Sequence, residues 1–356
     1  MISPLRAIPK HTVVAFAALG LLWSGAASAG EIEESNSACL DCHDGEDSAI
    51  HFADGSTITV GISADSWKKS AHSTEVRCKD CHTTIKDHPH PAVNFATKRA
   101  YQLDRAQTCK RCHYAYHTKA QDSIHAKELA KGNDKAPTCT DCHGVHNETD
   151  RASRQAVTLR CGNCHAKVAE QYAQSVHGAA WGKASVNVPM CVDCHGAHAI
   201  MDPRKAAFHT RSWDICSKCH SDAEKMAGTG LSTKVVETYL DDFHGRSNER
   251  YAQGAGSPRK PIATCSDCHG VHDIRSFRAA KKNGTLQSEV IVACRKCHKD
   301  APPAFADAWL SHDPPTLASA PLVVLIQWGY RVLIPLIMAG LVLHILLHLW
   351  RARVHR

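Results

Sequence analysis

The sequence has few of the large apolar side chains that usually build a hydrophobic core. It contains 7 Phe, 7 Tyr and 5 Met in 356 residues, against 18 Cys and 26 His. A chain of this length would ordinarily form one large or two average domains, each around its own core. We therefore expect that something other than aliphatic and aromatic side chains fills much of the interior.

The central part of the chain also lacks an excess of charge of either sign. The formal net charge is +7, but six of the 42 Lys and Arg lie in the first ten residues or at and after Arg331. The remaining 36 face 35 Asp and Glu between residues 30 and 320, a balance of +1. This balance does not support a basic surface for nucleic acid.

The N-terminal residues have the pattern of a secretory signal peptide. Arg6 and Lys10 precede the apolar run TVVAFAALGLLW, and Ala27-Ser28-Ala29 has the small-x-small form of a cleavage site. We predict a signal peptide over residues 1–29, with the body of the protein outside the cytoplasm. The alternative is an uncleaved anchor, for which the apolar run is short.

The C-terminal residues predict one transmembrane helix. Val332 to Trp350 is an apolar stretch long enough to cross the hydrocarbon core of a bilayer. Three arginines follow it at once, which places the C-terminus in the cytoplasm by the positive-inside rule. The sequence thus predicts a periplasmic domain over residues 30–320 and, over residues 321–356, a transmembrane helix with a short cytoplasmic tail. This places the protein at the periplasmic side of a bacterial inner membrane.

Not one cysteine falls outside a single pattern, C-x-x-C-H, which occurs nine times. We number these motifs 1 to 9 in chain order. Their cysteines are Cys39 and Cys42, Cys78 and Cys81, Cys109 and Cys112, Cys139 and Cys142, Cys161 and Cys164, Cys191 and Cys194, Cys216 and Cys219, Cys265 and Cys268, and Cys294 and Cys297. The histidines that close them are His43, His82, His113, His143, His165, His195, His220, His269 and His298.

C-x-x-C-H is the attachment motif of c-type haem. The two thiols bond to the porphyrin vinyl groups, and the adjacent histidine ligates the iron. A zinc site does not require a histidine after every cysteine pair. A redox dithiol would be expected once or twice, and a disulfide framework would not place a histidine after each pair. The pattern therefore predicts nine covalently bound c-type haems.

The motifs alternate between two kinds. Motifs 3, 5, 7 and 9 have Lys, Arg or Asn before the second cysteine, whereas motifs 2, 4, 6 and 8 have Asp there. Motif 1, CLDCH, is odd in position but carries Asp. Short segments that end in histidine follow the odd motifs, and AKVAEQYAQSVH and VVETYLDDFH among them predict helices over 166–177 and 235–244. HGxH follows motifs 4, 6 and 8, whereas DHPH follows motif 2. The repeating unit is therefore an odd motif, a segment that ends in histidine, an even motif and a nearby histidine. It occurs four times, and a fifth, half unit ends at His312.

The repeat places nine further histidines, one for each haem. They are candidate second ligands of the irons: His72, one of His88 and His90, His125, His146, His177, His198, His244, His272 and His312. For any single one, a surface histidine is the alternative. His51, His117 and His209 lie outside the repeat, and we expect them to be ordinary.

The second histidine of HGxH cannot serve the haem of its own motif. In CVDCHGAH, His198 follows His195 by three residues and does not reach the far side of the same ring. It could ligate the iron of a neighbouring haem instead. Such a histidine would link two haems and help to fix their separation.

This arrangement resembles the multihaem c-type cytochromes with doubled CxxCH motifs, over roughly residues 38 to 312. The resemblance implies a mainly α-helical fold with extensive coil and few strands, in which closely spaced haems form the core. It also implies electron transfer between the membrane quinone pool and a periplasmic or outer acceptor. The alternative function is a multihaem reductase or oxidase of small nitrogen or sulfur oxyanions, with one open haem. No CxxCK motif, a mark of some such enzymes, is present.

The predicted transmembrane helix carries His344 and His348 on one face. His344 lies about 10 Å from Arg351 along a straight helix, and an ionisable residue at such a depth is a functional candidate. The segment resembles the first helix of the membrane cytochrome b subunits that accompany some multihaem cytochromes. That resemblance implies a b-type haem shared with a partner, or a quinone site, with His344 as a ligand. The alternative is a plain anchor.

Overall fold

The computed structural model describes residues 29–45, 47, 49–146, 154–181, 188–253, 261–308, 312 and 314–355. The described chain is mainly helical, and most of its helices are one to three turns long. Its strands, β1 (Ala49–His51) and β2 (Thr57–Thr59), form one antiparallel hairpin in which Ile50 is opposite Ile58. The predicted fold class is thereby confirmed. Of the predicted signal peptide, residues 1–28 lie outside the described residues.

The short helices fall into groups that follow the repeat. Odd motifs lie in or at the C-terminal ends of α1 (Ala29–His43), η1 (Gln107–Arg111), α8 (Arg154–Gly162), α13 (Ser212–His220) and α19 (Leu286–Cys294). Even motifs form helices of one turn, α3 (Cys78–Cys81), α7 (Cys139–His143), α11 (Cys191–His195) and α17 (Cys265–His269). Between the two kinds lie α2 (Ala64–Lys68), α5 (Tyr114–Gln121), α6 (Ile124–Ala130), α9 (Ala166–Gln174), α10 (Val176–Ala180), α15 (Val235–Asp241) and α16 (Phe243–Ala252). The remaining helices are α4 (Lys98–Ala106), α12 (Ala206–Thr210), α14 (Ala223–Met226), α18 (Arg278–Asn283), η2 (Pro303–Ala308) and α20 (Pro321–Val354).

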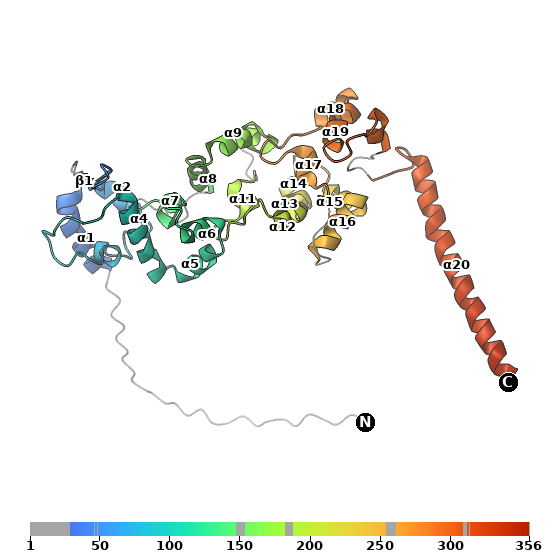
Figure 1. The fold of residues 1–356 in the computed structure, drawn as a ribbon, viewed down its shortest axis with the longest axis horizontal. Helices are drawn as coiled ribbons and strands as arrows, with labels where there is room; N and C mark the ends of the chain where they lie inside the picture. The colour runs from blue at the N-terminus through green and yellow to red at the C-terminus, as the bar shows by residue number, and fades with distance from the viewer. Residues whose placement is uncertain are drawn as a thin grey trace, which may run out of the picture.

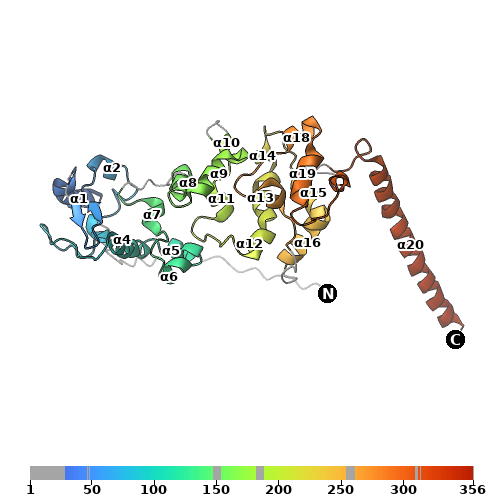
Figure 2. The same cartoon turned by 45° about the horizontal axis from the view of Figure 1, so that its top comes forward.

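The units are arranged in a row. Figure 1 shows the groups of helices following one another along the long axis in approximate chain order, with α1 at one end of the row and α18 and α19 near the other. The second view keeps this order (Figure 2). The described part is therefore built like a repeat protein, in which each unit contacts mainly its neighbours.

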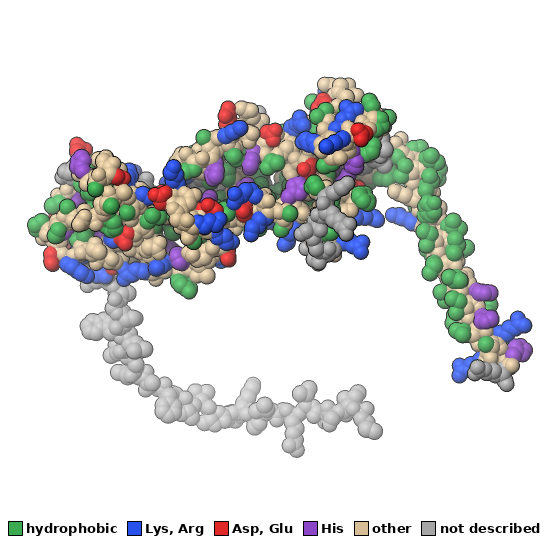
Figure 3. All heavy atoms as spheres, viewed as in Figure 1, with side chains coloured by type: hydrophobic (Ala, Val, Ile, Leu, Met, Phe, Trp, Pro, Cys, Tyr) green, Lys and Arg blue, Asp and Glu red, His purple; other side chains and the backbone are tan. Residues whose placement is uncertain are grey.

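The protein part of the core is thin, as the composition predicts. Half of the twelve buried hydrophobic residues of the described part are alanines, and the others include larger side chains such as Trp67 and Tyr239. The space-filling view shows histidines scattered along the row rather than gathered in one patch (Figure 3). The interior is thus shared among many small local clusters.

Helix α20 is long and apolar enough to span a membrane. It begins at Pro321, eleven residues before the predicted apolar stretch, and continues to Val354 through Pro335. It extends away from the row of units, and none of its residues is buried within the chain (Figure 1). An apolar helix exposed along its whole length needs a bilayer or a partner to cover it.

Candidate haem-binding sites

An Asp cap builds the short helix of each even motif. The carboxylate accepts a hydrogen bond from the backbone N–H of the residue before the first cysteine, at 2.9 Å for Asp80 and 2.7 Å for Asp141, Asp193 and Asp267. Such a bond satisfies a donor that a helix start leaves free. The Asp that distinguishes the even motifs therefore has a structural reason.

The odd motifs need no such cap because a preceding helix carries them. In motif 7, for example, Cys216 and Cys219 lie in the last turns of α13. Motif 1 also lies at the end of a longer helix, α1, despite its Asp41. Its position in the fold is therefore that of an odd motif.

Glycine turns the chain after three of the even motifs. Gly144, Gly196 and Gly270 follow the motif histidines and have φ values of 92°, 81° and 93°. Side chains rarely adopt this conformation, and glycine does so freely. The turn directs the second histidine of HGxH away from the motif that precedes it.

The histidines between the motifs lie at sharp corners. We expected single helices over 166–177 and 235–244, and this is wrong at the C-terminal ends. Each segment instead forms two helices in succession. Where the first helix ends, Ser175 or Asp242 caps the second by accepting a hydrogen bond from the backbone N–H three residues later, at 3.0 and 2.8 Å. Ser70 and Ser123 stand in the same place before His72 and His125 and accept from their backbone N–H groups. A local side-chain bond therefore overrides the helical period at each corner.

The corner at Ser175 is so tight that only glycine fits after His177. A Cβ added to Gly178 would collide with the Tyr172 carbonyl oxygen and would lie 2.7 Å from the Ala173 Cα. A Cβ added to Gly245 would likewise collide with the Tyr239 carbonyl oxygen. Both obstacles are backbone, which side-chain rotation cannot relieve.

Replacing this glycine should therefore damage the corner. We expect Gly178→Ala to lower the free energy of unfolding by about 3 kcal/mol, the upper range for overpacking. Thermal unfolding of the purified protein measures the effect. Ala179→Ser, on the exposed side of the same turn, is the matched control and should change little. Equal stability of the two variants would contradict the tight corner.

Each motif histidine faces one histidine from outside the motifs. The nine pairs, in motif order, are His43–His90, His82–His146, His113–His72, His143–His198, His165–His125, His195–His272, His220–His177, His269–His312 and His298–His244. Their ring centroids are 5.9 to 6.3 Å apart. No histidine is shared between two pairs. Of the two alternatives in DHPH, His90 is in a pair and His88 is exposed.

This spacing fits two ligands on opposite sides of one metal ion. Metal–imidazole bonds are about 2.0 Å long, and with about 1.1 Å from nitrogen to centroid in each ring the centroids lie about 6.2 Å apart. Stacked rings in direct contact lie closer together than this. The donor set of every pair thus fits a six-coordinate haem iron held between two imidazoles.

The pairs connect neighbouring units in both directions. An odd motif faces a histidine from the unit before it, as His165 faces His125. An even motif faces the HGxH histidine of the next even motif, as His143 faces His198. The two histidines of CVDCHGAH thus belong to different pairs, because His198 lies opposite motif 4 and His195 lies opposite His272.

The pairs at the two ends of the described row use histidines from outside the regular HGxH and corner positions. Motif 1 faces His90, from the DHPH stretch that replaces HGxH in the first unit. Motif 8 faces His312, from the segment that follows motif 9. Within this segment, Ala301 and Ala306 pack with Ile291, and Cys294 lies against this cluster. The irregular first and last units therefore act as caps of the repeat.

Burial keeps many of these imidazoles neutral. Burial, with a smaller effect of His146, lowers the pKa of His82 to about 4. Burial likewise lowers the pKa of His125, His177 and His195. A neutral imidazole is the form that binds a metal. In motif 8, His269 Nδ1 donates to the Arg275 carbonyl at 2.9 Å, which leaves Nε2 free for a ligand.

Contacts between cysteines show that motifs that follow one another in the sequence are neighbours in space. The first cysteines of an odd motif and the following even motif lie against each other, as Cys216 and Cys265 do. Parallel contacts join Cys39 to Cys78, Cys109 to Cys139, and Cys161 to Cys191. Each even motif then approaches the next odd motif: burial and, secondly, the Cys161 thiol raise the pKa of Cys142 to about 11. Successive motifs are therefore neighbours along the whole row.

Basic side chains join three of the four even motifs to the odd motif that follows. Arg111 donates to the Asp80 carbonyl at 2.9 Å, Arg160 to the Cys142 carbonyl at 2.6 Å, and Lys296 to the Asp267 carbonyl at 3.2 Å. These bonds recur at equivalent junctions. They place a positive charge between two candidate haem sites.

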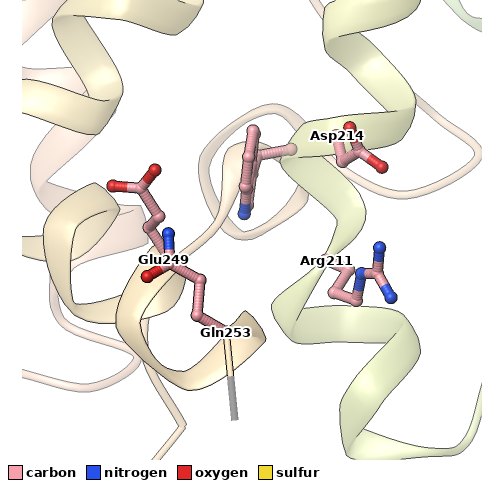
Figure 4. Close-up of a pocket in the computed structure, with 5 residues that line it drawn as sticks. Arg211, Asp214, Glu249 and Gln253 are labelled. Atoms are coloured by element: carbon pink, nitrogen blue, oxygen red, sulfur yellow. The ribbon is translucent and has the colours of Figure 1, made fainter. Parts of the chain in front are cut away.

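Buried donors without a partner lie beside motif 7. Within the described residues, Ser212 Oγ and Trp213 Nε1 are buried and have no hydrogen-bond partner. Trp213 lines a hollow together with Arg211 and Asp214 of its own segment and Glu249 and Gln253 of another (Figure 4). Buried donors of this kind require an acceptor, and the propionates of a haem supply one.

Sequence reasoning missed the residues that position the histidines. Ser70, Ser123, Ser175 and Asp242 each stand two residues before a paired histidine, so the signal was a [Ser/Asp]-x-His repeat. Tyr172 and Tyr239 donate to the Pro189 and Ala263 carbonyls, just before motifs 6 and 8. His209, expected to be ordinary, lies with Nε2 2.9 Å from the Asp267 carboxylate.

Residues 133–221 match the family model described as cytochrome c3. This segment contains motifs 4 to 7 and three of the corner and HGxH histidines: His146, His177 and His198. Searches of curated proteins and of solved structures returned no match.

Proposed function

We propose that this chain, a multihaem c-type cytochrome and electron carrier, holds nine haems in one row. We propose also that it connects the membrane quinone pool to a redox partner in the periplasm. The observation that carries the proposal is the set of nine one-to-one histidine pairs with centroids 5.9 to 6.3 Å apart. A haem supplies one-electron chemistry at its iron. Two strong ligands leave no position for a substrate, which suits a carrier.

We assign the residues by their place in the repeat. The two cysteines of each motif attach the haem, the motif histidine is the first ligand, and the histidine paired with it is the second. The protein then sets spacing and potential through ligands, burial and nearby charge. The order of the cysteine contacts supports a path that follows the chain from motif 9 to motif 1, or the reverse.

Helix α20 provides the connection to the membrane in this proposal. The arginines after Trp350 support a cytoplasmic C-terminus, with residues 30–320 on the periplasmic side. One helix cannot enclose a cofactor, so a membrane cytochrome b or other quinone-reactive subunit would complete the site. His344, facing such a partner, would ligate a shared b-type haem or line a quinone site.

Reduction by quinol tests this connection. In membranes that contain the full chain, a soluble menaquinol analogue should reduce the c-type haems, and His344→Ala should slow that reduction at least tenfold. His348→Ala, closer to the membrane surface, is the matched control. Dithionite should reduce the same number of haems in all three proteins. Reduction of the His344→Ala protein at the original rate would remove His344 from the path.

A reductase of small oxyanions is the alternative function, and one observation bears on it. Tyr116 lies 4.9 Å from the His198 ring, and the Lys119 ammonium lies 5.9 Å from the Tyr116 ring. A Tyr and a Lys beside a haem ligand are groups that an enzyme would use. Binding of nitrite, hydroxylamine or tetrathionate to the oxidised protein, detected as a change in its optical spectrum, would favour this alternative.

A further inference from the structure

The residue before the second cysteine carries a different charge at different motifs. Motifs 1, 2, 4, 6 and 8 have an Asp, motifs 3, 7 and 9 have Arg111, Lys218 and Lys296, and motif 5 has the neutral Asn163. This residue lies between the two attachment points of the haem. Where this residue is charged, its charge would therefore lie near the edge of a haem attached at that motif.

The structure fixes the carboxylates of the even motifs in place. Each is bound to the N–H that begins its own motif helix, at 2.7 to 2.9 Å. Asp141 is in addition 3.0 Å from Arg99, and Asp267 is 2.9 Å from His209. A bound carboxylate keeps a constant position relative to the motif, unlike a free surface side chain.

The cations of motifs 3 and 9 point back toward the preceding even motif. Arg111 and Lys296 donate to carbonyl groups of Asp80 and Asp267. At an even site the carboxylate therefore opposes the arriving cation, whereas sites 3, 7 and 9 have the cation without a carboxylate in their own motif.

We infer that the residue before the second cysteine sets the relative reduction potentials along the row, with lower potentials at the Asp sites than at the cation sites 3, 7 and 9. Oxidation leaves the iron with one more positive charge, which a nearby carboxylate stabilises and a nearby cation destabilises. Net charge near a haem is one of the means by which a protein sets its potential. The inference rests on the proposed function, since it requires a haem at each motif.

A pair of charge changes tests the inference in opposite directions. Asp193→Asn keeps an acceptor for the Met190 N–H and removes the charge, whereas Asn163→Asp adds a charge at the equivalent position of motif 5. The full-length, detergent-purified proteins are titrated and followed by haem absorbance, and covalent haem is counted separately by intact mass. In Asp193→Asn, about one ninth of the absorbance change should move to higher potential, and in Asn163→Asp one ninth should move to lower potential. Both shifts should shrink at high salt.

The two readouts separate the inference from the proposed function. Nine haems with no displaced wave, or with waves displaced in the same direction, would overturn the inference and leave the carrier intact. A haem count below nine in the unmodified protein would overturn the proposed function itself. If Asp193→Asn does not assemble, Asn163→Asp decides alone, and an unchanged or raised potential there overturns the inference.

Discussion

Excision of residues 126–177 should leave a folded membrane protein with seven covalent haems in place of nine. The excised segment is 52 residues long, which equals the spacing from Cys109 to Cys161, from Cys139 to Cys191 and from His146 to His198. It removes motifs 4 and 5 together with His146 and His177. The new junction, Ser123-Ile124-His125-Gly178, reproduces the native corner Ser175-Val176-His177-Gly178.

Every remaining haem site keeps two histidines after this excision. His198 moves opposite motif 2, in place of His146, and His125 moves opposite motif 7, in place of His177. The backbone also has a matching bond available. Ile124 N–H donates to the Ile200 carbonyl at 2.8 Å, and Val176 N–H donates to the Ile274 carbonyl at 2.9 Å, so the two corners are interchangeable.

Intact mass and the low-spin haem spectrum measure the outcome. We expect the mass of the shortened chain plus seven haems, with all seven low-spin. The control is a half-unit excision of residues 126–151, which places odd motifs 3 and 5 side by side and breaks the alternation of junctions. It should lose haem or fail to fold. If both excisions behave alike, the repeat does not determine the assembly.

Replacement of His198 by Ala should expose the iron at motif 4 while leaving motif 6, its own motif, unchanged. The reason is the pairing of His198 with His143, at 6.0 Å, and of His195 with His272. One haem in nine should become high-spin, and the covalent haem count should stay at nine. A histidine that served its own motif would open motif 6 instead.

Backgrounds that lack one motif decide which haem has changed. In Cys139→Ala/Cys142→Ala, which cannot attach the motif 4 haem, His198→Ala should add no high-spin signal. In Cys191→Ala/Cys194→Ala, which cannot attach the motif 6 haem, the signal should appear in full. The reverse result would show that each HGxH serves its own motif, contrary to the pairs in the structure.

Local sequence was enough to predict the parts of these sites. The nine motifs, the thin core and the histidines of the repeat follow from spacing and composition, and each expected repeat position indeed carries a paired histidine. The pairing of His198 with a motif other than its own could be predicted, because a separation of three residues is too short for it to lie opposite His195. The choice between His88 and His90 could not, because both lie in an irregular stretch.

The direction of pairing could not be predicted because it depends on contacts between units. Nothing near His125 shows that it faces motif 5, which begins 36 residues later at Cys161. The helix boundary at Ser175 was also missed. Apolar residues recur at helical spacing through 166–177, but the Ser175 hydroxyl accepts a hydrogen bond from the Gly178 N–H and the helix ends there. Bonds of this kind compete with helices and are weak signals in a sequence.

The Asp of the even motifs is an intermediate case. Its regular occurrence was visible in the sequence, but its use as a cap depends on where each motif helix begins. An even motif begins its own helix after an extended segment and needs a cap at its first turn. An odd motif ends a helix that is already formed, so other residues are tolerated there.

Low-temperature EPR of the oxidised, detergent-purified protein, with optical spectra beside it, tests the central claim most directly. The claim is that each of nine haems has two histidine ligands, and it predicts that essentially all of the iron is low-spin. A high-spin signal from about one haem in nine would contradict it. That haem would have an open position, and the protein would then be tested as a reductase.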